Sequence, residues 1–391
     1  YEHTKPYEDW FWEKNKIELK RAYVKAVDVE SNRLAFQDGS TMTYDKLVIA
    51  TGSKPNKFGW PGQDLKGVQG LYSYQDLELM ESNTKGIRRA VVVGGGLIGI
   101  EMAEMLLSRN IPVTFLVREK SFWNNVLPAE ESAMINRHIH EHGVDLRLNT
   151  ELDEILADDT GRVKAVRTKE GQLIDCQFVG LTAGVSPNVE FLKSSGIELN
   201  RGVLVDEYLR TNVNNVFAAG DCAEFRKPIG ERKSIEQVWY TGRMMGEALG
   251  RTLAGKPTAY KPGHWFNSAK FFDIEYQTYG WVWPEKKADE SEFYWEHSKG
   301  KICLRLRWKS SNGQLVGVNN FGFRLRHQAF DKWFREEKTV HYVLEHLRDA
   351  NFDPEFYRQH EEEIIARFNA ENGTQLKLRK KSWQRILQLV S

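Results

Sequence analysis

The middle of the chain, about residues 86–184, alternates short apolar runs with segments in which apolar residues recur every three or four positions. Strands are predicted for the apolar runs, at 90–93, 113–117, 145–157, 162–168 and 173–182. Helices are predicted where the spacing is helical, at 97–109 and 129–142. An order of strand, helix, strand, helix predicts an α/β fold whose parallel sheet is connected by crossover helices.

The flanking segments differ from the middle in pattern and composition. Short strands bounded by turn sequences are predicted at 17–29, 33–36, 44–50 and 216–219. A helix is predicted over about 235–253. Beyond residue 260, where seven of the 12 Trp lie, strands are expected to about 320 and helices after it. Three domains are predicted, formed by residues 1–85 with 185–258, by the inserted residues 86–184, and by an α+β segment, 259–391.

Charge and cysteine usage narrow the class of protein. The 55 Lys and Arg nearly balance the 54 Asp and Glu, which gives no reason to expect nucleic acid or an anionic membrane as a partner. No apolar run approaches the roughly 20 residues of a membrane-spanning helix. The three cysteines, Cys176, Cys222 and Cys303, lie far apart, which excludes a disulfide scaffold and a Cys-X-X-Cys motif. We predict a cytoplasmic protein.

The strongest local signal is a glycine-rich turn, Gly-x-Gly-x-x-Gly, that directly follows a predicted strand and opens a predicted helix. In such a turn Gly94 permits the tight bend, Gly96 lets the backbone approach a pyrophosphate, and Gly99 permits close packing of the helix on the strand. The helix start at Leu97 and Ile98 offers N–H groups and the positive end of the dipole to the phosphates. This context favours a dinucleotide site over an ordinary glycine turn.

The end of the next predicted strand, Val117-Arg118-Glu119-Lys120, is where such a site contacts the adenosine ribose. An acidic residue there favours NAD, whereas an arginine favours the 2′-phosphate of NADP. Val117 stands nearest to the usual place of the acid, and Arg118 and Lys120 are cationic, so NADPH is favoured over NADH. The alternative is that both cations are solvated at a strand end.

Two further predicted strands end in small residues, which leave room for a bulky ligand close to the backbone. One strand ends in Ala50-Thr51-Gly52 and the other in Gly220-Asp221. A carboxylate placed after such a glycine could accept a hydrogen bond from a ligand hydroxyl. Alternatively, Asp221 only caps a helix.

Taken in order, these motifs and the segment Gly184-Val-Ser-Pro-Asn188 resemble the two-dinucleotide flavoprotein family. That family includes pyridine-nucleotide-disulfide oxidoreductases, NADH oxidases, and ferredoxin, rubredoxin and nitrite reductases. The resemblance covers about residues 10–260, and the remainder is only loosely similar to the family's C-terminal interface domain. It implies two Rossmann-like domains, one for FAD and one for NAD(P), followed by an α+β domain.

The resemblance also implies roles for individual residues. Ala50, Thr51 and Gly52 would lie beside FAD, and Asp221, after Gly220, would bind its ribityl chain or pyrophosphate. A helix beginning near Glu236 and Gln237 would point its N-terminus at the flavin. Glu101 would lie near the nicotinamide–flavin contact, and Gly184 would line the NAD(P) site. Hydride transfer from NAD(P)H to FAD would then be performed by the cofactors themselves.

One departure from the family is large. Full members carry an early Gly-x-Gly-x-x-Gly for the ADP half of FAD, and the sequence has none before Ala50. We therefore expect that the chain lacks a βαβ unit of about 30 residues. The expected consequences are poor FAD binding and poor stability, and a reactive thiol of the parent protein could lie in the absent segment.

The predicted function is an FAD-dependent oxidoreductase that passes electrons from NAD(P)H to an acceptor that the sequence does not identify. A small redox protein of the ferredoxin or rubredoxin type, a quinone-like molecule and O2 are the acceptors considered. The alternatives are a thiol-dependent disulfide or peroxide reductase and a low-turnover nucleotide-binding protein of the apoptosis-inducing-factor type. The aromatic-rich third domain is compatible with a homodimer.

Two histidines, His138 and His142, are four residues apart on a predicted helix and could form a metal-binding pair. The sequence suggests no third ligand. A cluster at the end of the helix, next to Gly143, is the simpler interpretation, and no metal site is predicted.

Overall fold

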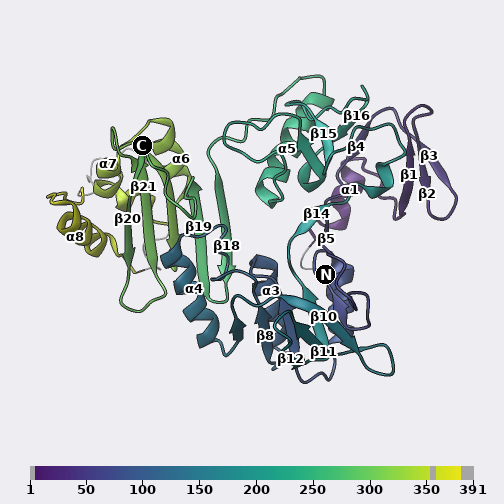
Figure 1. The fold of residues 1–391 in the computed structure, drawn as a ribbon. Helices are drawn as coiled ribbons and strands as arrows, with labels where there is room; N and C mark the ends of the chain where they lie inside the picture. Colours follow the sequence, from purple (N-terminus) through teal and green to yellow (C-terminus); the bar gives the residue numbers. More distant parts are fainter. Residues whose placement is uncertain (1–4, 353–357, 380–391) are drawn as a thin grey trace. The chain divides into compact units, whose positions relative to one another are not determined.

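The computed structural model describes residues 5–352 and 358–379 (Figure 1). Its packing divides the chain into two units. Unit 1 comprises the residues up to Ser53 together with Pro187–Lys261. Unit 2 comprises Lys54–Ser186 together with the residues from Pro262 onward. The parts of the predicted terminal domains at 1–4, 353–357 and 380–391 lie outside the described residues.

Unit 2 contains a parallel five-stranded sheet in the order β6-β13-β7-β8-β9. The strands are β6 (Val68–Gln69), β7 (Ala90–Val93), β8 (Val113–Leu116), β9 (Asp145–Arg147) and β13 (Phe178–Leu181). Every residue of β7, β8 and β13 is buried, as expected for parallel strands that are covered on both faces. The predicted crossover helices are present as α3 (Leu97–Leu107) and α4 (Ala129–Glu141), which confirms the α/β prediction.

Two smaller elements complete this half of unit 2. The antiparallel strands β10 (Leu152–Ala157), β11 (Val163–Thr168) and β12 (Leu173–Asp175) form a separate three-stranded sheet. Helix α2 (Tyr74–Asn83) begins at a capping box, in which Ser73 and Asp76 satisfy each other's backbone N–H groups. Its Met80 packs in the same core as Ala90 and Ile100.

The other half of unit 2 is an antiparallel sheet in the order β18-β19-β22-β21-β20 with helices after it. The strands are β18 (Phe266–Phe271), β19 (Ile274–Gly280), β20 (Glu290–Glu296), β21 (Cys303–Lys309) and β22 (Leu315–Phe321). The helices are α6 (His327–Arg335), α7 (Val340–Glu345) and α8 (Glu361–Asn372). This order of strands and then helices agrees with the α+β expectation.

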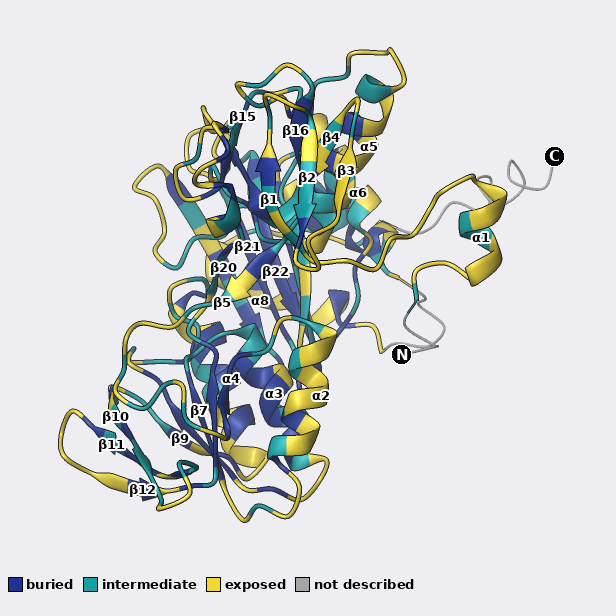
Figure 2. Ribbon diagram, turned by 90° about the vertical axis from the view of Figure 1, so that its right-hand side faces the viewer, coloured by how far each residue is buried: buried dark blue, intermediate teal, exposed yellow. Residues whose placement is uncertain are grey.

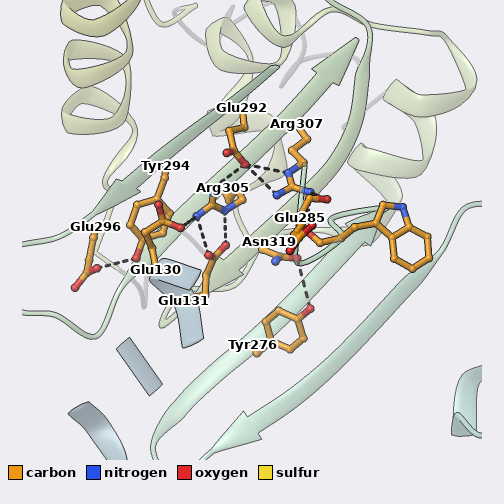
Figure 3. A network of polar contacts seen from close by, with 11 residues as sticks. Glu130, Glu131, Tyr276, Glu285, Glu292, Tyr294, Glu296, Arg305, Arg307 and Asn319 are labelled. Carbon is orange, nitrogen blue, oxygen red and sulfur yellow. Dashed lines mark hydrogen bonds and ion pairs between the residues drawn. The ribbon is translucent and has the colours of Figure 1, made fainter. Parts of the chain in front are cut away.

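The two faces of this sheet pack against different partners because side chains alternate along each strand. Leu304 and Leu306 of β21 share a core with α6, α7 and α8. Cys303 belongs instead to the core of α3 and α4. Arg305 and Arg307 alternate with the two leucines, and Arg305 meets acidic residues of α4 (Figure 3). The C-terminal sheet is therefore joined to the nucleotide-type sheet through α3 and α4.

Unit 1 is built from small sheets around a core that includes Val203, Phe217 and Leu249. Its antiparallel strands are β1 (Val24–Asp28), β2 (Arg33–Phe36) and β3 (Thr41–Thr43), and its parallel pairs are β4 (Leu47–Ile49) with β16 (Val216–Ala218) and β15 (Val203–Val205) with β17 (Ala223–Phe225). Helix α5 (Trp239–Leu253) packs on the turn after β16. Val48, in the middle of β4, is 39% exposed.

Five local predictions were wrong. The strands predicted over 145–157 and 173–182 are each divided into two strands of different sheets, β9 with β10 and β12 with β13. The strand predicted over 17–29 is limited to β1, and residues 9–14 form the short helix α1 (Asp9–Lys14), every residue of which is at least partly exposed (Figure 2). Helix α5 begins at Trp239 rather than near 235. Residues 54–85 pack with unit 2 rather than unit 1, because β6 forms an edge of the parallel sheet.

The chain passes between the units at β5 (Ser53–Pro55) and β14 (Val185–Pro187), which pair with each other. Within the described residues, no helix has the length and apolar character that crossing a membrane requires.

Candidate dinucleotide-binding sites

The glycine turn of unit 2 connects β7 to α3, and two of its glycines are required by packing. Gly94 has φ +123°, and a Cβ added there would lie 2.7 Å from the carbonyl oxygen of Thr182. A Cβ at Gly99 would lie 3.0 Å from both the ring of Phe115 and the hydroxyl of Thr182. These contacts agree with the predicted roles of Gly94 in the bend and of Gly99 in packing α3 on the sheet.

Gly96 has a different environment. Its backbone is extended, with φ −132°, and no atom of the described chain lies within 4 Å of where its Cβ would be. Gly96 is the N-cap of α3 and offers no side chain to bind the N–H groups of the first turn, to which Leu97 and Ile98 belong. Uncapped N–H groups at a helix start, next to a glycine whose Cβ position is open, are suited to a phosphate.

The strand-end cations predicted to select NADPH are on the surface. Arg118 and Lys120 are exposed, and Val117 between β8 and Arg118 is buried. The guanidinium of Arg118 donates to the carboxylate of Glu119 at 2.9 Å. A 2′-phosphate would have to compete with Glu119 for Arg118, so the choice between NADH and NADPH stays a prediction.

Two further predicted residues of the NAD(P) site lie in unit 2. Glu101, in the second turn of α3, retains access to solvent, yet its pKa is raised, first by partial burial and then by the charge of Glu104. Gly184 has φ +92°, and its carbonyl accepts a hydrogen bond from the backbone N–H of Asn56 at 3.1 Å. Asn56 was not predicted, and it would be 3.3 Å from a Cβ at position 184.

The predicted FAD segments of unit 1 come together at the ends of β4 and β16. Ala50 is exposed, and Gly52 has the left-handed value φ +64°. The hydroxyl of Thr51 donates to the carbonyl of Asn188 at 2.7 Å, and the N–H of Asn188 donates to the carbonyl of Gly52 at 2.9 Å. These two hydrogen bonds hold residues 51–52 beside Asn188, although the two segments are far apart in the sequence, at the edge formed by the ends of β4 and β16.

Asp221 belongs to a small polar cluster beside this edge. Gly220, with φ +76°, starts the 3-10 turn Gly220–Cys222. The hydroxyl of Ser53 donates to Asp221 at 3.1 Å, and the side-chain amide of Gln237 donates to Ser53 at 2.7 Å. Ser53 was missed by the sequence analysis. The cluster offers a carboxylate held in place by neighbours, which suits the binding of a hydroxyl-rich chain.

Glu236 does not belong to that cluster. Its buried carboxylate accepts from Arg232 at 2.9 Å and from the hydroxyl of Tyr260 at 3.4 Å. The helix predicted to begin at this residue starts at Trp239, with Val238 as its N-cap. The carboxylate of Glu236 is therefore committed within the protein, and of the predicted pair only Gln237 lies beside Asp221.

The three cysteines are all buried thiols. Burial raises the pKa of Cys176 to about 12 and raises the pKa of Cys303 well above its ordinary value. Burial also raises the pKa of Cys222, and hydrogen bonds with Thr51 offset only part of that effect. Because the thiolate is the nucleophile, none of the three is suited to disulfide or peroxide reduction.

A testable consequence concerns thiol reactivity. In the folded protein at mildly alkaline pH, dithionitrobenzoate should react at least about tenfold more slowly than with the unfolded chain, because raised pKa values leave little thiolate. The release of coloured thiolate measures this rate, with denaturant added as the control. Rapid reaction of one thiol in the folded protein would show that a cysteine is accessible and ionised.

Known proteins are similar to this chain over much of its length. A family model described as pyridine nucleotide-disulphide oxidoreductase matches residues 6–246. Nitrite reductase (NAD(P)H) of Bacillus subtilis (strain 168) is 33% identical over 220 residues, which cover 56% of this chain and 27% of that protein. Rhodocoxin reductase of Rhodococcus erythropolis is 31% identical over 250 residues, which cover 63% and 58%. The chain thus spans less than two thirds of either relative.

Solved structures are similar over more of the chain. A structure of an NAD-dependent persulfide reductase from A. fulgidus aligns with a TM-score of 0.79, covering 94% of this chain and 72% of that one at 22% identity. At this identity the likeness bears on the fold. It confirms the predicted fold class, two Rossmann-like parts followed by a C-terminal sheet domain.

Proposed function

We propose that this chain, which belongs to the pyridine nucleotide-disulphide oxidoreductase family, takes electrons from NADH or NADPH through FAD and passes them to a separate acceptor. The family is FAD-dependent and uses NAD(P)H. The observation that carries the proposal is the glycine turn, in which Gly94 and Gly99 are required by packing whereas Gly96 faces open space at the start of α3. A dinucleotide pyrophosphate needs this combination.

The chain's proposed part is to bind and orient the cofactors. The N–H groups of Leu97 and Ile98 would donate to the nucleotide phosphates, and Glu101 and Gly184 would line the nicotinamide half of that site. When bound, FAD supplies the hydride-accepting chemistry, which belongs to the cofactor and needs no side-chain acid or base.

In unit 1 the residues suited to FAD are those at the ends of β4 and β16. Asp221, held by Ser53, would accept from a hydroxyl of the ribityl chain. Ala50, Thr51 and Gly52 would lie along the flavin. These residues fit the flavin half of FAD, and the only Gly-x-Gly-x-x-Gly of the sequence lies in unit 2.

For the acceptor we propose a small redox protein. The support is that relatives are named rhodocoxin reductase and NADH-rubredoxin oxidoreductase. A thiol-dependent reaction at the cysteines of this chain is disfavoured by their burial. A homodimer and a cytoplasmic location remain predictions.

The direct test is flavin reduction. We expect that anaerobic mixing of the protein, loaded at an FAD concentration high enough to offset the weak binding expected above, with NADH or NADPH bleaches the flavin absorbance within seconds. Arg118→Ala should weaken the binding of NADPH more than the binding of NADH, since only NADPH carries the 2′-phosphate. Stopped-flow absorbance measures the rate of flavin reduction with each nucleotide.

NADH serves as the internal control for this variant. Equal effects of Arg118→Ala on the two nucleotides would remove Arg118 from the site. A flavin that is bound but not reduced would reject the oxidoreductase and favour the low-turnover nucleotide-binding protein.

A further inference from the structure

We propose that His138 and His142 of α4, together with Asp273 from the turn between β18 and β19, form a binding site for a zinc-class divalent metal ion. The two histidines lie on one face of the helix, with ring centroids 4.6 Å apart. An oxygen of Asp273 lies 2.6 Å from Nε2 of His138 and 2.9 Å from Nε2 of His142. The three potential ligand atoms all lie within 4.8 Å of one another.

The rings are buried or held in position. The side chain of His138 is 1% exposed, and neither of its nitrogens is aligned for a hydrogen bond with any described residue, although Asp273 is so close. The ring of Phe272 stacks on that of His142 at 4.2 Å and 20°. A buried nitrogen without an aligned partner is costly, and a metal ion bound to the two Nε2 atoms would satisfy it once the exposed Asp273 side chain shifts from direct contact to become the third ligand.

The donor set determines the class of metal. Two imidazoles and one carboxylate suit zinc and similar transition ions, and three protein ligands leave a position for water. Lys301 lies 3.7 Å from the second oxygen of Asp273 and 3.2 Å from Glu141. Its charge opposes an ion held by electrostatic attraction alone, so Ca²⁺ and Mg²⁺ are disfavoured relative to an ion that binds strongly to nitrogen.

The position of the site indicates a structural purpose. His142 and Asp273 are 131 residues apart and belong to the two halves of unit 2. A shared metal ion would join the C-terminal end of α4 to the C-terminal sheet. The bond between Glu131 and Arg305 joins the same helix to that sheet near its N-terminal end. This site lies outside the glycine turn and does not depend on the proposed electron transfer.

The experiment is a zinc titration of chelator-treated protein against a chromophoric chelator. We expect one zinc ion bound with Kd below about 1 μM. His142→Ala and Asp273→Asn should each raise Kd at least about tenfold. His140→Ala removes an exposed histidine of the same helix and should leave Kd unchanged.

A second group of potential ligands, His297, His360 and Glu363, must be separated from the first. Glu363→Gln should retain the tight zinc ion if the assignment is correct. Zinc should also raise the unfolding temperature of the original protein and of His140→Ala, and not that of Asp273→Asn. The proposal is overturned if no tight zinc binds, if Asp273→Asn binds as tightly as the original protein, or if Glu363→Gln abolishes binding.

Discussion

Arg305→Ala is expected to destabilise unit 2 by about 3–5 kcal/mol, because it removes one partner of a buried ion pair. Arg305 is 1% exposed and Glu131 of α4 is fully buried. The guanidinium donates twice to that carboxylate, from Nε at 2.7 Å and from Nη2 at 2.8 Å (Figure 3). Without Arg305, the Glu131 carboxylate would be left in the core without its counter-charge.

The surrounding charges enlarge the expected effect. Arg305 also donates to Glu130 at 2.6 Å and to Glu292 at 2.8 Å, and Arg307 shares Glu292 at 3.0 Å. Burial alone would lower the pKa of Arg305, but its bonds with Glu131 and the neighbouring carboxylates outweigh burial and raise it. The network therefore holds the guanidinium charged between α4 and the C-terminal sheet.

The same network predicts the direction in which the stability of unit 2 changes with pH. Burial by itself would raise the pKa of Glu292, but Arg305 and Arg307 outweigh it and lower the pKa below its ordinary value. A carboxylate with a lowered folded pKa contributes stability above its unfolded pKa, and that contribution is lost as the pH falls through the folded pKa. Part of the stability of unit 2 should therefore disappear on acidification.

Chemical unfolding followed by tryptophan fluorescence measures the free energy of unfolding that Arg305→Ala removes. Arg137→Ala is the matched control, because Arg137 of α4 pairs with Glu296 of the neighbouring strand β20 at the surface, and its cost should be below about 1 kcal/mol. Arg305→Met combined with Glu131→Gln should recover much of the stability, since no buried charge is left alone. An Arg305→Ala cost as small as that of Arg137→Ala would contradict this account.

The fold could be predicted where the deciding contacts are local. Ala90–Val93 was predicted with its observed bounds, because a fully apolar run ended by a glycine turn is a local signal. The start of α5 was misplaced by about four residues, since the sequence has no capping residue that marks it: Val238 is the N-cap and makes no side-chain cap hydrogen bond. Residues 54–85 were assigned to the wrong packing unit because β6 pairs with β13, which is about a hundred residues further along.

The candidate sites also contain features that the local sequence predicts and features that depend on contacts between distant residues. The separate requirements at Gly94, Gly96 and Gly99 follow from one local motif: packing explains Gly94 and Gly99, and the role of Gly96 beside a pyrophosphate stays a prediction. Ser53 beside Asp221 could not be found from spacing, because the two are 168 residues apart. Asp273 was missed for the same reason: periodicity identifies residues on one helix face, and it does not identify the strand turn that packs on that face.

Gly96→Val is expected to weaken binding of NADH and NADPH by about 100-fold, equivalent to about 2.7 kcal/mol, while leaving the protein folded. The extended backbone of Gly96, with φ −132°, accepts a β-branched residue without strain. Its Cβ would meet no described atom within 4 Å, so the expected cost in free energy of unfolding is that of a poorer N-cap, below about 1 kcal/mol. The added methyl groups would occupy the space that a pyrophosphate must enter.

Gly99→Val is the contrasting variant three residues away. Its side chain would be forced against Phe115 and Thr182, so it should destabilise the fold by about 1–3 kcal/mol. Calorimetric titration with each nucleotide, together with unfolding curves, separates loss of binding from loss of structure. If Gly96→Val folds and still binds both nucleotides with unchanged affinity, the pyrophosphate does not lie at the start of α3 and the dinucleotide assignment of unit 2 is wrong.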